Sequence, residues 1–139
     1  MIVSLLYISR CALEPERAAE QVADILATAR SRNAELQLTG ALIWTEVCFA
    51  QILEGPEASV DEVMAGIARD PRHTDMRVLF KRPIAERRFS DWRMAYSGTA
   101  TYVDRHLALL FGGFTKQTTA IEQLVTLMEE YSRMSQRRR

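Results

Sequence analysis

The sequence has few of the residues that build disulfide frameworks or metal sites. Its 139 residues include two cysteines, Cys11 and Cys48, and two histidines, His73 and His106. Two widely separated cysteines are too few for a disulfide framework or a zinc site. The chain also lacks the phosphate-loop patterns G-x-G-x-x-G and G-x-x-x-x-G-K, and the H-E-x-x-H, C-x-x-C and G-x-S-x-G motifs. It therefore gives no signal for a nucleotide-phosphate, metal or hydrolytic site.

An excess of charge of one sign and a long apolar run are also absent. Lys plus Arg and Asp plus Glu number 18 each, so the net charge is zero and gives no general attraction to nucleic acid or anionic membrane. No apolar run approaches the roughly 18 to 20 residues that span a bilayer. The apolar start, Met1 to Tyr7, has no basic leader, unlike a signal peptide. We expect a soluble, cytoplasmic protein with reduced cysteines and neither nucleic acid nor membrane as partner.

What is present is an ordinary globular composition, with 47% hydrophobic and 26% charged residues. Apolar periodicity predicts strands of alternating or continuous apolar residues over Ile2–Ile8, Thr39–Trp44, Val47–Leu53, Met76–Ile84 and Trp92–Ser97. It predicts helices from Glu14 to near Asn33 and over Pro56–Arg69, Tyr102–Phe111 and Gln117–Met134.

The predicted order of elements over residues 1–97 is β-α-β-β-α-β-β. This order favours an α+β fold, a ferredoxin-like sandwich with both helices on one sheet face and a fifth strand added. Residues 98–139 are expected to form a carboxy-terminal extension of two helices. The last helix carries an apolar stripe that should cover the other sheet face or meet a partner, formed by Ile121, Leu124, Val125, Met128 and Tyr131.

Five segments resemble the BLUF (blue light using flavin) family in order and spacing, from about Ile2 to Ser97. They are Leu6-Tyr7-Ile8-Ser9; Asn33 with Leu38-Thr39-Gly40-Ala41-Leu42; Phe49-Ala50-Gln51-Ile52-Leu53-Glu54-Gly55; Asp70-Pro71-Arg72-His73; and Arg88-Phe89-Ser90-Asp91-Trp92-Arg93-Met94. A single strand ending in L-E-G is common, whereas five segments in register are specific.

The resemblance implies that Tyr7 and Gln51 are the photoactive pair. A phenol can give up an electron and a proton, and an amide carries both donor and acceptor groups, so it can bridge phenol and flavin in two arrangements. The plain alternative for Tyr7 is a strand aromatic with a satisfied hydroxyl. Gln51 would need buried polar partners among its apolar neighbours.

The resemblance also implies flavin contacts on the two predicted helices. Asn33 matches an asparagine that pairs with the pyrimidine end of the ring, and a helix C-cap is its alternative role. Arg32 could donate to the second carbonyl or be an exposed helix-end arginine. Ile25 and Ile67 match residues that flank the ring, and core packing is their alternative.

Asp70, Arg72 and His73 match the stretch near the ribityl chain and ring edge, although a lone His73 would more often be a surface or capping residue. The family's basic residue one turn before Ile67 is absent, since that region contains Ala65-Gly66. The departure leaves open a phosphate or ribityl contact there and the choice between FAD, our expectation, and FMN.

Trp92 and Met94 match a pair on the last strand that relays the signal. Being two residues apart, they point to the same sheet face, and core packing is the alternative for both.

We therefore expect a photosensory protein, not an enzyme, with no room for an effector domain after Ser97. It would signal through a homo-oligomer or a separate effector protein. Two rival hypotheses remain. A light-indifferent adaptor module would be colourless when purified, and a small flavin-dependent redox enzyme would show substrate-dependent flavin reduction in the dark.

Overall fold

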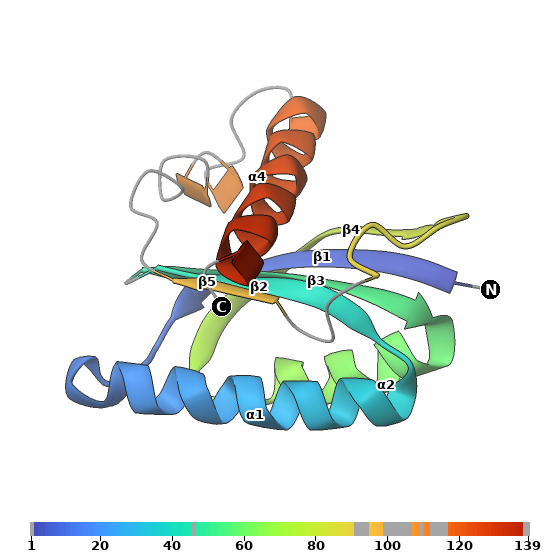
Figure 1. Ribbon diagram of the computed structural model, residues 1–139. Coiled ribbons are helices and arrows are strands. Elements are labelled where there is room, and N and C mark those ends of the chain that lie inside the picture. The colour runs from blue at the N-terminus through green and yellow to red at the C-terminus, as the bar shows by residue number, and fades with distance from the viewer. Residues whose placement is uncertain are drawn as a thin grey trace.

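The computed structural model describes residues 2–45, 47–90, 95–98, 107–108, 110–111 and 117–137. Five strands and two helices make up most of the described residues, and a long helix follows them (Figure 1). They are β1 (Ile2–Cys11), the 3-10 turn η1 (Pro15–Arg17), α1 (Ala18–Leu36), β2 (Thr39–Trp44), β3 (Cys48–Pro56), α2 (Glu57–Ala68), β4 (His73–Pro83), β5 (Ala95–Gly98) and α4 (Gln117–Arg137).

The strands form one sheet in the order β4-β1-β3-β2-β5. The pairs β1–β3, β1–β4 and β2–β3 are antiparallel, and β5 adds in parallel beside β2. This arrangement confirms the predicted ferredoxin-like α+β fold with an additional strand. The register places Tyr7 opposite Gln51, and Gln51 opposite Leu42, across the three central strands.

Both faces of the sheet are covered by helices. Successive side chains of each strand point to opposite faces, so β1, β2 and β3 each contribute to both cores. On one side, α1 and α2 lie along the sheet, and on the other side α4 crosses it (Figure 1). The core under α1 and α2 includes Tyr7, Leu42, Phe49 and Leu53. The core under α4 is built from the alternate strand positions and the helix, and includes Ala50, Ile52, Phe89, Leu124, Val125 and Met128.

The first helix is one turn longer than the sequence indicated. We expected it to stop near Asn33, but it continues to Leu36, and Gln37 takes the left-handed conformation with φ of 61°. The backbone N–H groups of Gln37 and Leu38 both donate to the Asn33 carbonyl oxygen, which caps the last turn. Asn33 therefore lies inside the helix, fully buried.

Two other expectations change. β4 begins at His73, three residues before the predicted Met76, because His73 pairs with Cys11 at the end of β1. The apolar stripe of the last helix covers the sheet and is not free to contact a partner, since Leu124, Val125 and Met128 are buried against the sheet. Trp92 and Met94 lie outside the described residues, as does much of the predicted helix 102–111.

Candidate functional site

A cleft opens between the sheet and the helices α1 and α2. It is lined by side chains from all of these elements and from the segment before β4, namely Tyr7, Ile25, Thr28, Ala29, Arg32, Leu42, Phe49, Gln51, Ile67, Asp70, Arg72 and His73. The space between the walls is about 510 Å³, including the open mouth.

Tyr7 and Gln51 lie at the floor of the cleft on adjacent strands. The Tyr7 hydroxyl donates a short hydrogen bond to Gln51 Oε1, and both residues are at most 5% exposed. Burial raises the pKa of the Tyr7 phenol, the nearby Arg32 charge opposes that shift, and Asp70 adds to it. Tyr7 is thus a neutral phenol that can donate at neutral pH. With Oε1 facing Tyr7, the amide nitrogen of Gln51 points away from the phenol.

The α1 wall is one helical face, since Ile25, Thr28, Ala29 and Arg32 are spaced by three or four residues. Arg32 Nη2 donates to Asn33 Oδ1 at 3.5 Å. Its Nε is buried and has no hydrogen-bond partner among the described residues. Burial lowers the pKa of the Arg32 guanidinium, and the Tyr7 side chain counteracts this. A buried N–H donor without a partner is unfavourable, so the cleft suits a ligand with acceptor oxygens.

Asp70 and Arg72 form a bidentate ion pair beside the mouth of the cleft. Arg72 Nε donates to both carboxylate oxygens at 2.9 and 3.0 Å, and its backbone N–H donates to Oδ1 at 2.9 Å. The hydrogen bond from the Arg72 side chain is the largest cause of the lowered pKa of Asp70, which burial partly opposes. The ion pair therefore holds one negative and one positive charge in the wall of the cleft.

His73 bridges the sheet and α2. Its Nδ1 is 2.7 Å from Ser9 Oγ and its Nε2 is 2.7 Å from the Ile67 carbonyl oxygen. Because a carbonyl only accepts, Nε2 carries the hydrogen and Nδ1 accepts from the Ser9 hydroxyl in the neutral ring. The ring also packs edge-on against Tyr7 and Phe49. His73 therefore holds the last turn of α2, with Ile67, against β1.

The structure brings most of the predicted site residues to one place. Tyr7, Ile25, Arg32, Gln51, Ile67, Asp70, Arg72 and His73 all line the cleft. Asn33 is not among the lining residues but accepts a hydrogen bond from Arg32, whereas Trp92 and Met94 lie outside the described residues. The sequence analysis missed four lining residues, namely Thr28, Ala29, Leu42 and Phe49. Helical spacing from Ile25 could have indicated Thr28 and Ala29, and strand register and alternation around Gln51 could have indicated Leu42 and Phe49.

The lining fits a flat heteroaromatic ring such as a flavin. Ile25 and Ile67 supply apolar walls from the two helices, while Gln51 and Arg32, whose Nε has no partner among the described residues, supply polar side chains. Within the described part of the chain, no group of three or more potential metal ligands comes together. No described helix is long and apolar enough to cross a bilayer.

Known proteins of similar sequence and fold identify the family of this α+β domain. Residues 2–95 match the BLUF family, described as sensors of blue light using FAD. The fold is similar to that of BlrB, a BLUF protein in its dark state, with a TM-score of 0.71 and 35% identity over 78% of this chain and 84% of that chain. It is also similar to BlsA in its ground state, with a TM-score of 0.78 and 25% identity over 93% and 88% of the two chains. This chain belongs to the BLUF family of flavin-using blue-light sensors.

A much longer protein contains a region that is similar in sequence to this chain. The photoactivated adenylate cyclase subunit beta of Euglena longa is 35% identical over 94 residues, which are 67% of this chain and 11% of that relative. The chain thus spans about a tenth of the length of this relative.

Proposed function

We propose that the chain is a photoreceptor in which Tyr7 and Gln51 convert light absorption by a bound flavin into a change of hydrogen bonding. The observation that carries the proposal is the buried hydrogen bond from the Tyr7 hydroxyl to Gln51 Oε1 at the floor of the cleft. When bound, an oxidised flavin absorbs blue light and its excited ring accepts an electron and a proton.

Tyr7 is suited to supply that electron and proton. Its hydroxyl holds its proton at neutral pH, since burial raises the pKa of the phenol, and the proton is already directed at Gln51. Transfer of both particles from Tyr7 leaves no net charge in the cleft. This matters because a buried unpaired charge is expensive. Return of both to Tyr7 restores the neutral phenol, so the cycle consumes nothing, and the dark form is recovered when the Gln51 amide turns back thermally.

Gln51 provides the persistent change. Its amide has one acceptor oxygen and a two-hydrogen donor nitrogen, and either can face Tyr7. While Tyr7 lacks its proton, it can only accept, which favours turning the amide nitrogen toward it. The rearranged Gln51 would offer a bound flavin a stronger hydrogen bond, and this would move the flavin absorption to longer wavelength.

The other cleft residues would hold the ring. Ile25 and Ile67 would flank it, and Arg32 would donate an N–H group to a ring acceptor. Asp70, Arg72 and His73 would lie toward the ribityl chain and ring edge, and Asn33 would orient Arg32 through their contact. We propose FAD as the cofactor, with FMN as the alternative, to be distinguished by chromatography of the flavin released on denaturation.

We assign residues 1–97 to the sensor and residues 98–139 to a helical extension that carries the output. Trp92 and Met94 pass the change from Gln51 toward that extension. Output then reaches an effector protein or a homo-oligomer. Because the apolar stripe of α4 packs inside the chain, contact with a partner would use the outer, polar face of the extension.

The test is the absorption spectrum of purified protein in the dark and directly after blue illumination, for wild type and Tyr7→Phe. A reversible shift to longer wavelength in wild type, and no shift in a Tyr7→Phe protein that still binds flavin, are expected. A bound flavin that light leaves unchanged would overturn the proposal, as would a protein that cannot be loaded with flavin. Flavin reduction by a substrate in the dark would favour a redox enzyme instead.

A further inference from the structure

The proposed flavin cleft and the helix α4 lie on opposite faces of the sheet (Figure 1). A ligand in the cleft therefore cannot touch α4, and any influence on that helix has to cross the sheet. β3 is the strand best placed for this, because its alternation presents Gln51 to the cleft and Ile52 and Glu54 to the α4 side. Gln51 and Glu54 are three residues apart on the same strand.

Glu54 is a buried carboxylate, 1% exposed, on the face of the sheet that α4 covers. Its Oε2 accepts the backbone N–H of Arg88 at 2.8 Å and its Oε1 accepts the backbone N–H of Phe89 at 2.8 Å. The Thr39 hydroxyl is 3.4 Å from Oε1. Two consecutive backbone N–H groups on one carboxylate form charge-assisted hydrogen bonds, which are stronger than neutral ones. Glu54 thereby fixes the backbone of residues 88–89 to β3.

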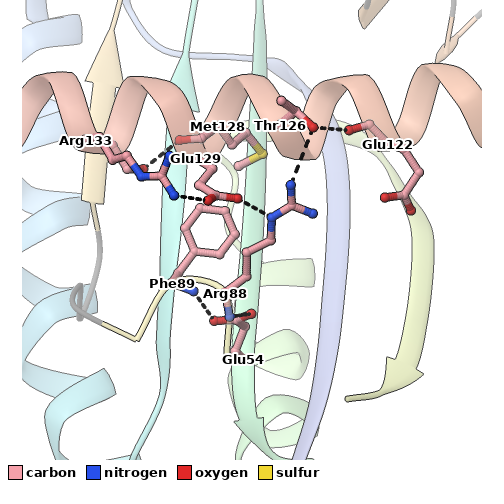
Figure 2. A network of polar contacts seen from close by, with 9 residues as sticks. Glu54, Arg88, Phe89, Glu122, Thr126, Met128, Glu129 and Arg133 are labelled. Carbon is pink, nitrogen blue, oxygen red and sulfur yellow. Dashed lines mark hydrogen bonds and ion pairs between the residues drawn. The ribbon is translucent and has the colours of Figure 1, made fainter. Parts of the chain in front are cut away.

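The same two residues are attached to α4 (Figure 2). Phe89 is completely buried in the core that also contains Leu124, Val125 and Met128 of α4. The Arg88 guanidinium forms an ion pair with Glu129, and its Nη2 is 3.5 Å from the Thr126 hydroxyl. Glu129 also pairs with Arg133 one turn further along the helix. The Glu129 side chain is 16% exposed and the Arg88 side chain 40% exposed, so solvent screens this half-buried pair less than an ion pair with both partners exposed.

Arg87, which precedes Arg88 in the chain, attaches the same segment to the domain at a third point. Its Nη1 donates to the Glu54 carbonyl oxygen and to the Thr39 hydroxyl, both at 3.0 Å, and its Nη2 donates to the Gln37 carbonyl oxygen at 2.8 Å. Residues 87–89 are therefore held by β3, by the start of β2 and by the end of α1. α4 is thus fastened to a segment whose position is set by the strands of the cleft.

We propose that Glu54, Arg88 and Glu129 are positioning residues that fasten α4 to β3 and couple its attachment to the state of Gln51. The coupling part rests on the proposed function. A displacement of β3 at Gln51 moves the Glu54 carboxylate, the backbone of residues 88 and 89 follows, and the ion pair between Arg88 and Glu129 weakens. α4 then opens more readily in the lit state.

The test compares amide hydrogen exchange of α4 in the full flavin-loaded chain for wild type, Arg88→Gln, Glu129→Gln and the double variant. Glu122→Gln is the matched control, because Glu122 also lies on α4 and pairs with Arg82 of β4 at 3.1 Å, but its side chain is 45% exposed. None of these residues lines the cleft. In the dark, Arg88→Gln and Glu129→Gln should each speed α4 exchange by about five- to thirtyfold, and Glu122→Gln by about twofold or less.

The double variant should exchange about as fast as Glu129→Gln alone, since both substitutions remove the contact between Arg88 and Glu129, whereas Glu129→Gln also removes the pair with Arg133. Glu54→Gln should act in the same direction, because an amide nitrogen cannot accept the N–H it would face. If Glu129→Gln exchanges no faster than Glu122→Gln in the dark, the fastening role is wrong, whatever Glu54→Gln does to folding.

Illumination decides the coupling. In wild type, light should speed α4 exchange, and Glu129→Gln should remove most of this light–dark difference while keeping the full spectral shift. An unchanged light–dark difference in Glu129→Gln would overturn the coupling. If wild type shows no spectral shift at all, the proposed function and the coupling fail together, and the dark comparison still decides whether these residues fasten α4.

Discussion

The Tyr7 hydroxyl donates a hydrogen bond to Gln51 Oε1 between two residues that face each other directly in the antiparallel pairing of β1 and β3. Sheet register therefore sets their separation, and neither side chain reaches from a flexible loop. Both are buried at the floor of the cleft. A pair held in this way can exchange hydrogen-bond partners, and the predictions on Tyr7 and Gln51 below depend on it.

The first prediction concerns the cost of leaving the Tyr7 hydroxyl without its partner. Gln51→Leu should abolish the light-induced spectral shift and lower the free energy of unfolding by about 1–3 kcal/mol, because a buried donor is left unsatisfied. Adding Tyr7→Phe should recover part of that loss, since removing both partners can be nearly neutral. Urea unfolding of the two single variants and the double variant measures this. A double variant as unstable as the sum of the singles would contradict it.

Alkaline pH should reduce stability through Tyr7. Burial raises the pKa of this phenol above the value of about 10 that it has in the unfolded chain. Below pH 10 both states keep the proton and the contribution of Tyr7 to stability is complete. Above pH 10 the unfolded chain loses the proton first, so stability falls by up to about 1.4 kcal/mol per pH unit.

The matched control is Tyr7→Phe, which keeps the other titrating groups. The decline in unfolding free energy above pH 10 should be less steep in this variant than in wild type. Equal slopes in the two proteins would show that the Tyr7 phenol titrates alike in the folded and unfolded states.

Arg32 should contribute to flavin affinity through its buried Nε. Arg32→Ala removes a donor that has no partner among the described residues, and a hydrogen bond from a charged group contributes about 1.5–3 kcal/mol. Flavin titration followed by fluorescence should therefore show an affinity loss of about ten- to a hundredfold. Arg30→Ala, an exposed arginine of the same helix, is the control and should bind flavin as wild type does. Equal losses in both variants would indicate a general effect of charge.

Two glycines of the domain should respond in opposite directions to alanine. A Cβ on Gly40 would lie 2.0 Å from the Ile52 carbonyl oxygen, a backbone atom of the neighbouring strand. Gly40→Ala should therefore cost about 3 kcal/mol or more. A Cβ on Gly66 in α2 meets nothing within 4 Å, so Gly66→Ala should stabilise by about 0.5–1 kcal/mol. Thermal unfolding of the two variants measures both, and a Gly40→Ala protein as stable as wild type would contradict the register of β2 and β3.

The sequence by itself determined the elements and their order. Apolar periodicity separates strands from helices because a buried face repeats every two residues in a strand and every 3.6 in a helix. The resemblance to the family also indicated that Tyr7 and Gln51 act as a pair, and the observed topology makes their strands β1 and β3 neighbours. The residues that the sequence assigned to the cleft are mostly those that strand alternation and helical spacing place on one face.

Only the tertiary structure decided contacts between residues far apart in the chain. The local sequence pattern does not reveal the hydrogen-bond partners of Glu54, because they are backbone N–H groups 34 and 35 residues away. Nor does it show whether an apolar stripe packs inside the chain or on a partner, and α4 does the former. The end of α1 also differs from the prediction. Asn33 has the local properties of a helix cap, but its complete burial and the left-handed Gln37 extend the helix by one turn.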